Sequence, residues 1–336
     1  MDIRIGSLNC LNFGRESKNK KDIALFAGII LQERMDVIAL QEVKSAEVVD
    51  YILKQLNIRS RHAWKGFFDK REAKQEYAFI WNSDRVDLPK TKLANGETRV
   101  YYPHLYRQYR KDPSLGNLAL IRPPLYGRFQ TTIPNVPKIE IRLINTHIRF
   151  SKGKDGEEQA PTTGELFLRK FEFQALTSSI YYYVSDKVYG KPEGESSPLT
   201  AYTILLGDYN MNLRRSGASS SFLDNLETVV IPCGRSESRN KIIVTRQSEL
   251  TTLKKQKDSD GENAEQDDEQ RTEQKAQIFA NNYDHFSYDT NRFSGTRKRI
   301  SRVNTVEKYC NNDPQEHIKK VSDHTPIKMS LNIKKE

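Results

Sequence analysis

A four-residue segment after an apolar run has the composition of a metal or phosphate site. The run 202–206 ends in Gly207-Asp208-Tyr209-Asn210. Residues two apart on a strand face the same side, and the glycine permits a turn, so Asp208 and Asn210 can present their oxygens together. Such oxygens suit Mg²⁺, Mn²⁺ or Ca²⁺ better than zinc or copper. Glycine, aspartate and asparagine are also ordinary turn residues, and this segment alone leaves both interpretations open.

Other polar residues stand at the ends of apolar runs elsewhere in the chain. Asn9, Glu42 and His147 each follow such a run, and Asp323 and His324 precede the last one. Two imidazoles beside a cation suit phosphodiester hydrolysis, because one can accept a proton from water while the other donates one to the departing oxygen. The cation would stabilise charge on the phosphoryl oxygens. The remaining histidines lack this context and are predicted to be structural or surface residues: His62, His104, His285 and His317.

The segments that carry these residues alternate between strand and helix patterns. Apolar spacing of three and four residues predicts helices at residues 22–32, 46–56 and 164–184. Strands are predicted at residues 3–9, 37–40, 77–81, 118–121, 128–132, 139–145, 202–206, 284–288 and 325–333. The alternation predicts α/β layers rather than an all-helical or all-β protein.

Composition limits the class of protein and of partner. The chain has 336 residues, enough for a substantial core, and 54 basic against 44 acidic residues give a formal charge of +10. This excess favours acidic partners such as nucleic acid, phosphorylated substrates or anionic lipid. Three cysteines, far apart, form neither a disulfide framework nor a zinc site. The N-terminal segment lacks the features of a signal peptide, and no apolar run could span a membrane, so we expect a cytoplasmic protein.

Two polar segments interrupt the pattern. Residues 253–277 are rich in acidic side chains and lack aromatic ones, which predicts a disordered insertion. Residues 151–163 are charged and predict a surface loop. We expect the remainder to form one domain over residues 1–336.

The order of the motifs resembles the endonuclease/exonuclease/phosphatase superfamily, in its DNase I-like branch. The matching segments span nearly the whole chain and are Asn9, Leu40-Gln41-Glu42-Val43, Asn145-Thr146-His147, Gly207-Asp208-Tyr209-Asn210 and Ser322-Asp323-His324-Thr325-Pro326. The resemblance implies an α/β fold in which a two-sheet β-sandwich is flanked by helices, with the site at one end of the sandwich.

The resemblance also implies a role for each matching residue. Glu42 with Asn9 would hold a divalent cation, Mg²⁺ or else Mn²⁺ or Ca²⁺, and Asp208, Asn210 and Asp323 would shape the other half of the site. For proton transfer, the resemblance implies that His324, oriented by Asp284, activates water and that His147 donates a proton to the leaving oxygen. It also implies that Arg122 and Asn210 hold the scissile phosphate.

One position departs from the family pattern. In DNase I-like enzymes the first histidine pairs with a glutamate. One residue commonly stands between this glutamate and the tyrosine that follows it. In this chain Glu76 is directly adjacent to Tyr77, and Gln75 occupies the position two residues before the tyrosine, where the family has its glutamate. The resemblance therefore leaves Glu76 and Gln75 as alternative partners of His147.

Aromatic and basic residues alternate in one segment, which predicts contact with nucleic acid. Cations can neutralise backbone phosphates and tyrosines can stack on bases or sugars. The predicted contact residues are Tyr106, Arg107, Tyr109, Arg110 and Lys111. A second basic cluster comprises Arg297-Lys298-Arg299 and Arg302. Either cluster could instead be a solvated face.

Together with this resemblance, the sequence predicts a monomeric, metal-dependent endonuclease that cuts DNA with little sequence preference. The resemblance implies products with 5′-phosphate and 3′-hydroxyl ends. Two alternatives stay open: a phosphatase or phosphodiesterase acting on inositol phosphates or sphingolipid, and a catalytically silent nucleic-acid-binding or scaffold protein. A cytoplasmic DNase would endanger its host, so export by another route, an inhibitor or regulator protein, or conditional activation would have to control it. DNA against RNA and single against double strands stay undecided.

Overall fold

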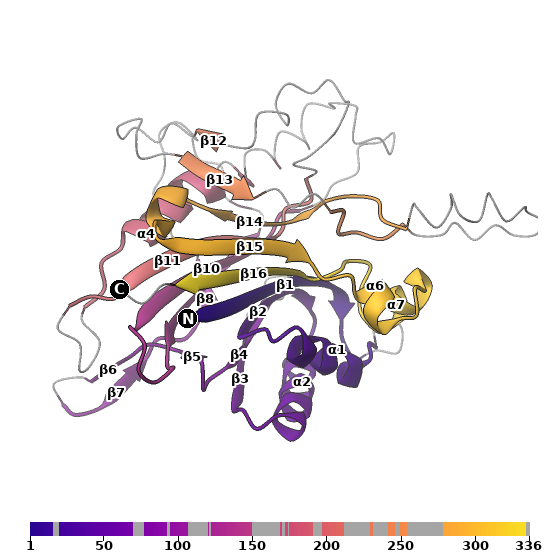
Figure 1. Ribbon diagram of the computed structural model, residues 1–336, viewed down its shortest axis with the longest axis horizontal. Coiled ribbons are helices and arrows are strands. Elements are labelled where there is room, and N and C mark those ends of the chain that lie inside the picture. The colour runs from indigo at the N-terminus through magenta and orange to yellow at the C-terminus, as the bar shows by residue number, and fades with distance from the viewer. Residues whose placement is uncertain are drawn as a thin grey trace, which may run out of the picture.

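Two β-sheets pack face to face, and helices cover their outer faces (Figure 1). The computed structural model describes residues 1–15, 20–69, 77–92, 95–106, 120, 122–149, 169, 172–173, 175–190, 197–211, 229–230, 241–245, 249–254 and 278–333, and the structural statements concern these residues. The arrangement confirms the predicted two-sheet sandwich flanked by helices.

The first sheet contains six strands and one parallel pair. In spatial order they are β15 (Thr296–Arg302), β16 (Ile327–Ile333), β1 (Asp2–Phe13), β2 (Val37–Val43), β4 (Tyr77–Asn82) and β3 (Trp64–Phe68). Only β1 and β2 run parallel. Their connection includes α1 (Ile23–Gln32), which begins where the Asp22 side chain accepts a hydrogen bond from the Leu25 amide.

The second sheet also contains one parallel pair. In spatial order its strands are β12 (Val229–Val230), β13 (Lys241–Thr245), β14 (Asp284–Tyr288), β11 (Thr200–Asp208), β10 (Ile139–His147), β9 (Leu125–Thr131) and β5 (Val86–Asp87), with β8 (His104–Leu105) also paired to β9. Strands β10 and β11 are parallel. A separate two-stranded ribbon is formed by β6 (Lys90–Lys92) and β7 (Thr98–Val100).

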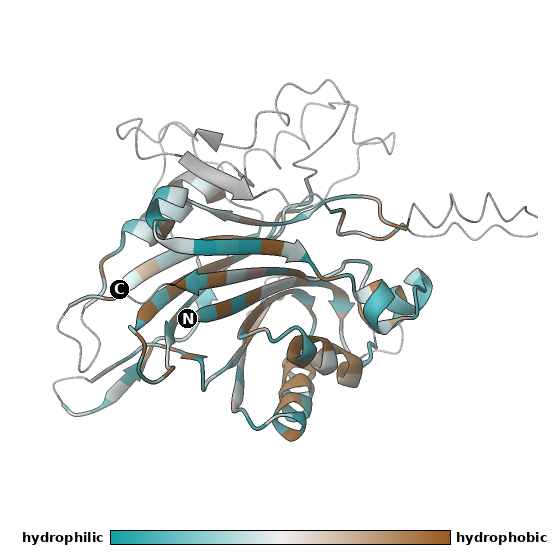
Figure 2. Cartoon of the chain, viewed as in Figure 1, coloured by the Kyte–Doolittle hydropathy of each residue, from teal (hydrophilic) through white to brown (hydrophobic). Residues whose placement is uncertain are grey.

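Alternation along the strands separates the layers. Ile3 and Ile5 of β1 face the apolar core between the sheets, whereas Leu8 and Cys10 pack in a second core with α1 and α2 (Ala46–Arg59). Figure 2 shows the resulting alternation of apolar and polar residues along β1 and β16. The outer face of the second sheet is covered by a π-helical turn (Leu176–Ile180) and α4 (Tyr181–Asp186).

Short helices complete the described chain: a 3₁₀ turn (Thr290–Phe293), α6 (Thr305–Tyr309) and α7 (Pro314–Lys320). The predicted helix 164–184 lies partly outside the described residues, and so does most of the predicted strand 118–121. Strands β3 and β15 were not predicted from the sequence. In the described part of the chain, no helix is long and apolar enough to span a bilayer.

The predicted insertion 253–277 lies mostly outside the described residues. Its first two residues are tied into the structure, because the Leu253 amide donates to the Asp323 carbonyl and the Lys254 amide donates to the Ile278 carbonyl. Leu253 also bridges to Phe279.

Candidate active site

Asp208 stands at the centre of the polar cluster that the strand ends form. Its side chain is 1% exposed, and Oδ2 accepts a hydrogen bond of 2.9 Å from Nδ2 of Asn9 in the opposite sheet. The same oxygen lies 3.7 Å from Nε2 of His147 and 3.8 Å from Nε2 of His324. The structure thus directs two imidazoles from different strand ends toward one carboxylate.

Strand register brings three of these residues together. His147 pairs with Asp208 across the parallel strands β10 and β11, and Asp208 pairs with Asp284 across β11 and β14. Gly207 precedes Asp208 with φ +136°, and a Cβ atom added there would lie 1.9 Å from the Thr146 carbonyl oxygen. A side chain cannot be accommodated at this close approach, so the glycine is required for the pairing as well as for the turn.

Asp284 orients His324. The carboxylate Oδ2 lies 2.8 Å from Nδ1 of the ring, and Asp284 is completely buried. Burial alone would lower the pKa of His324, but the charge and hydrogen bond of Asp284, reinforced by Asp208 and Asp323, raise that pKa to about 10. The Nδ1 proton is directed at Asp284, and Nε2 therefore faces Asp208.

At His147 the partner of Nδ1 is a donor, Arg122, whereas at His324 it is the carboxylate of Asp284. One guanidinium nitrogen lies 2.7 Å from Nδ1 of the ring. Because a guanidinium only donates, we infer that Nδ1 accepts and that the neutral ring carries its proton on Nε2. Burial and the positive charge of Arg122 lower the pKa of His147 well below its usual value. His147 in its neutral form can thus donate from Nε2, toward the same space that Nε2 of His324 faces.

The protonation of Asp208 depends on its burial. Removal from water raises the pKa of this carboxyl to about 7, although the charge of His324 and the hydrogen bond from Asn9 oppose the rise. Its second oxygen, Oδ1, accepts from the Asn210 amide at 2.7 Å. Asp208 is therefore held by donors on both oxygens.

Glu42 provides the carboxylate on one side of the site, next to the side-chain amide nitrogen of Asn9. Oε1 of Glu42 accepts from Nδ2 of Asn9 at 3.2 Å, and Oε2 accepts from the Asn12 amide at 3.0 Å. Glu42, Leu11 and Asn12 all have left-handed backbones, with φ of 58°, 48° and 54°. Strained positions of this kind concentrate at functional sites, so the local backbone supports a site here.

The donor set fits a hard divalent cation in an open site. Among the described residues, no three His, Cys, Asp or Glu side chains group as a metal cage. Mg²⁺ is ordinarily bound by one or two carboxylates, several waters and the substrate phosphates. Glu42 supplies a carboxylate of this kind, whereas Asn9 directs its amide nitrogen toward Glu42 and accepts from the Leu11 amide through its oxygen at 3.0 Å. Asp323 lies by His324, with Oδ1 at 3.9 Å from Nε2.

Asn210 braces the loop after β11. Its Nδ2 donates to the Ile148 carbonyl at 2.7 Å, and its own carbonyl accepts from Arg169 at 2.8 Å. The φ of 50° places Asn210 in the left-handed region, which asparagine adopts more readily than most residues.

The structure corrects one predicted nucleic-acid contact. The Tyr106 ring is 7% exposed and packs against Tyr126 and Tyr183 in the core beneath α4. Its ring therefore offers no free face for stacking on a base. The four other predicted contacts, Arg107, Tyr109, Arg110 and Lys111, lie outside the described residues, and so do Gln75 and Glu76.

A buried amide pair that sequence reasoning did not assign a role joins the two sheets beneath the site. Nε2 of Gln41 donates to Oδ1 of Asn145 at 2.6 Å, and Nδ2 of Asn145 donates to the Leu40 carbonyl at 3.0 Å. Gln41 directly precedes Glu42, and Asn145 stands two residues before His147. The pair therefore fixes the separation between the cation side and the histidine side.

Two further positioning residues lie beneath the histidines. The buried Tyr77 hydroxyl accepts from the His147 amide at 3.0 Å. The Ser322 hydroxyl donates to the Asn9 carbonyl at 2.6 Å and accepts from the His324 amide at 3.1 Å. Tyr77 could have been suspected from its place beside Glu76, and Ser322 from its place in the last motif.

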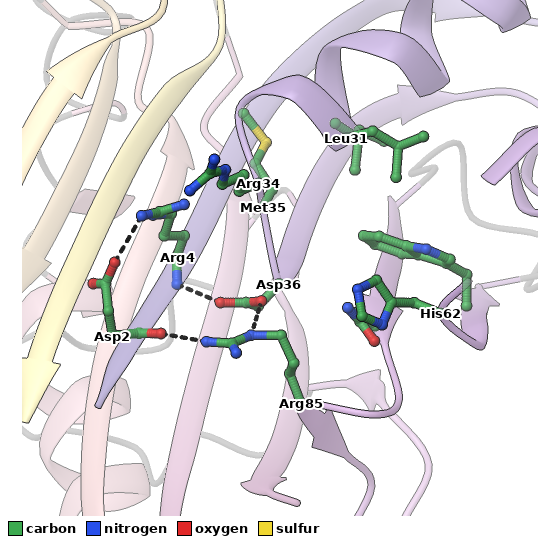
Figure 3. A pocket seen from close by; sticks show the side chains of 11 residues that line it. Asp2, Arg4, Leu31, Arg34, Met35, Asp36, His62 and Arg85 are labelled. Carbon is green, nitrogen blue, oxygen red and sulfur yellow. Dashed lines mark hydrogen bonds and ion pairs between the residues drawn. The ribbon is translucent and has the colours of Figure 1, made fainter. Parts of the chain in front are cut away.

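A pocket of about 420 Å³ lies at the other end of the first sheet (Figure 3). Four of its charged lining residues form two ion pairs, Arg4 with Asp2 and Arg85 with Asp36. It opens beside the first residues of β1, whereas Asn9 and Glu42 stand toward the opposite ends of β1 and β2. The strand-end cluster, rather than this pocket, contains the groups suited to acid–base chemistry.

Solved structures share this fold, although no protein family and no curated protein matches the sequence. D. rerio TDP2 complexed with a single-strand DNA product has 13% identity and a TM-score of 0.52, with 98% of this chain and 99% of that chain covered. An endonuclease/exonuclease/phosphatase from Bacteroides vulgatus has 10% identity and a TM-score of 0.55, with 99% and 100% covered. The human Nocturnin catalytic domain with bound sulfate has 12% identity and a TM-score of 0.51, with 99% and 95% covered. At these identities the likeness shows the fold alone, which is the DNase I-like fold expected from the motifs.

Proposed function

We propose that this chain is a divalent-metal-dependent phosphodiesterase that cuts nucleic acid, with DNA as its substrate. The observation that carries the proposal is the approach of Nε2 of both His147 and His324 to one oxygen of Asp208, at 3.7 and 3.8 Å. Their Nδ1 atoms have opposite partners, a donor at His147 and a carboxylate at His324. The site therefore contains one ring set to donate from Nε2 and one whose Nε2 can accept once it is neutral.

The roles follow from these hydrogen bonds. His324, held by Asp284, takes the proton of the attacking water, and His147 donates to the departing oxygen. Arg122 contributes a fixed positive charge beside His147 and, with Asn210, holds the scissile phosphate. Asp208 and Asp323 position the two rings and the water.

Glu42, with Asn9 beside it, would hold the cation, Mg²⁺ or Mn²⁺. The bound cation would supply charge stabilisation to the phosphoryl oxygens. In the protein itself, Nδ2 of Asn9 donates hydrogen bonds to the carboxylates of both Glu42 and Asp208. These bonds offset the repulsion between the two negative charges.

Nucleic acid is the favoured substrate because a polyanion complements the formal charge of +10. A structure with the same fold, that of D. rerio TDP2, contains a single-strand DNA product, which is consistent with such a substrate. By resemblance, the products would have 5′-phosphate and 3′-hydroxyl ends.

The test is a cleavage panel at fixed salt with Mg²⁺, comparing supercoiled plasmid, single-stranded DNA, RNA, inositol phosphates and sphingomyelin. We expect nicking of plasmid that stops when the cation is chelated. Cleavage of only inositol phosphate or sphingomyelin would replace nucleic acid with the lipid-type substrate. Inactivity on every substrate would contradict catalysis and support the scaffold alternative.

Matched variants identify the site in the same assay. His324→Ala and Glu42→Ala should each reduce nicking by about 10² to 10⁴ fold, because each removes a proton-transfer or cation-binding group. The controls are His62→Ala and Glu47→Ala, since both side chains are solvent-exposed and lie outside the cluster. Equal activity in all four variants, each folded by circular dichroism, would refute the assignment.

A further inference from the structure

Strand register divides the basic cluster Arg297-Lys298-Arg299 between the two faces of the first sheet. Arg297 pairs with Asn332 and Arg299 with Ser330 of β16, while Ser330 in turn pairs with Arg4 of β1. Paired residues in neighbouring strands point to the same face. Arg297 and Arg299 therefore lie on the outer face, and both are exposed.

The two other cations of the cluster are occupied elsewhere. Lys298 alternates to the inner side, where Nζ donates to the Phe293 carbonyl at 3.2 Å and lies 5.5 Å from the rings of Tyr288 and Phe293. Arg302 is paired with Glu249 at 3.6 Å. Of the cations on β15, only Arg297 and Arg299 remain directed outward.

The acidic residues of this outer face are already neutralised. Asp2 pairs with Arg4 at 3.0 Å. Glu33 is shared by Lys308 and Lys328, at 2.8 and 2.6 Å. Within the described part of the chain no carboxylate pairs with Arg297 or Arg299, so the face has an excess of positive charge.

Among the residues that the structure describes, no helix covers this part of the sheet. Helices α1 and α2 pack on the outer face through Leu8, Ile38 and Ile80, which belong to β1, β2 and β4. Figure 1 shows β15 and β16 beyond these helices, and Figure 2 shows the polar character of β15. The outer face of β15 and β16 at Arg297, Arg299 and their strand partners Asn332 and Ser330 is called the basic sheet face.

We propose that the basic sheet face binds the phosphate backbone of nucleic acid that extends beyond the active site, an inference that rests on the proposed function. Ser330, the partner of Arg299, follows His324 by six residues, which on an extended strand is roughly 20 Å. A duplex rises about 3.4 Å per base pair, so a flank of about six base pairs would be needed to reach Arg299. The contact would raise affinity for long substrates without selecting sequence.

Basic residues on an edge strand also have a simpler explanation, since charge there discourages pairing with another sheet edge. That explanation predicts no effect on nucleic-acid binding. The two roles are separated by measuring how affinity depends on substrate length and on salt.

The test compares Arg297→Glu/Arg299→Glu with wild type and with Lys54→Glu/Arg61→Glu. The control reverses two exposed cations on and next to α2, so the net charge changes equally. Binding of a 40-base-pair and a 6-base-pair fluorescent duplex is measured by anisotropy without divalent cation over a range of salt. A 40-nucleotide single strand is measured as a third substrate. The milder Arg297→Gln/Arg299→Gln variant replaces the double charge reversal if that variant does not fold.

We expect the sheet-face reversal to weaken binding of the long DNA at least tenfold relative to the control. The slope of log affinity against log salt should fall by about one to two, because each lost phosphate contact is worth about 0.9. Binding of the 6-base-pair duplex should match the control. Equal affinity and slope for the reversal and the control on long DNA would overturn the proposal.

Plasmid nicking by the same proteins separates this proposal from the proposed function. If wild type nicks plasmid and the reversal binds long DNA like the control, only the sheet-face proposal fails. If wild type binds long DNA through this face and cleaves no substrate, only the catalytic proposal fails.

Discussion

The Asp284 carboxylate lies 2.8 Å from Nδ1 of His324, although the two residues are 40 positions apart in the chain. Asp284 starts β14, and His324 forms an isolated bridge with Thr252 just before β16. Their contact therefore spans the two sheets at one end of the sandwich. It directs Nε2 of His324 toward Oδ2 of Asp208, the oxygen that both imidazoles approach.

Asp284→Asn should lower the pKa of His324 from about 10, because the charge of Asp284 is the main factor that raises it. NMR titration of the imidazole in cation-free protein measures this shift. Nicking should fall by about 10² to 10⁴ fold, since the ring loses its orientation. Asp84→Asn, which alters the exposed partner of His62, is the control and should leave His324 unchanged. An unshifted His324 in Asp284→Asn would rule out this positioning role.

Arg122→Gln should raise the pKa of His147, because the guanidinium charge is one cause of its low value. It should also weaken substrate binding, with KM increased roughly 10 to 100 fold, the equivalent of one charge-assisted hydrogen bond. Arg122→Lys keeps the positive charge but loses the planar guanidinium, which can form two parallel hydrogen bonds. The pKa of His147 should therefore stay low in this variant, whereas KM should remain above the wild-type value. Steady-state kinetics and NMR titration give both quantities. A Gln variant with wild-type KM would show that Arg122 does not hold the substrate.

Gly207→Ala should cost about 3 kcal/mol or more of unfolding free energy, because the new Cβ would collide with the Thr146 carbonyl at φ +136°. Urea denaturation measures the change. Gly190→Ala is the matched control, since a Cβ there meets nothing within 4 Å, and it should change stability by at most about 0.5 kcal/mol. Similar losses in both variants would contradict the close approach of β10 and β11.

His317 should make stability depend on pH. Burial lowers its pKa to about 4, and the ring is hydrogen-bonded to Thr305 and to the Ser322 carbonyl. The unfolded ring takes up a proton near pH 6.5 and the folded ring only near 4, so stability is lost as pH falls through this interval. The loss is on the order of 3 kcal/mol. Urea midpoints from pH 7 to 4 should fall less steeply in His317→Gln, and an identical slope would exclude His317 as a cause.

Local patterns in the sequence predicted most of the elements around the site. The helix pattern at residues 22–32 corresponds to α1, and the apolar run 202–206 lies within β11. These predictions succeed because apolar periodicity reflects which face each element buries. Strand β15 was missed because its alternating cations hide the apolar side, which contains only Ile300 as a hydrophobic residue.

The identity of the strand-end residues could also be taken from the sequence, but not their partners. The contact of Arg122 with His147, the burial of Tyr106 and the Gln41–Asn145 pair depend on how the two sheets pack. Roles assigned to the site residues stay predictions until the variants are measured. The single-domain organisation and the cytoplasmic location likewise stay predictions.

Apolar runs and the turn glycine of Gly207-Asp208 predicted that polar residues gather near the ends of the strands: His147 and Asp208 end β10 and β11, whereas β1 and β2 continue past Asn9 and Glu42. The hydrogen bond between Asn9 and Asp208, 199 positions apart, became visible only in the folded chain. The same is true of the outward direction of Arg297 and Arg299 and the inward direction of Lys298. The physical reason is that periodicity is local, whereas register and sheet packing are set by contacts between distant segments. One residue of shift in β15 would reverse every side chain on it.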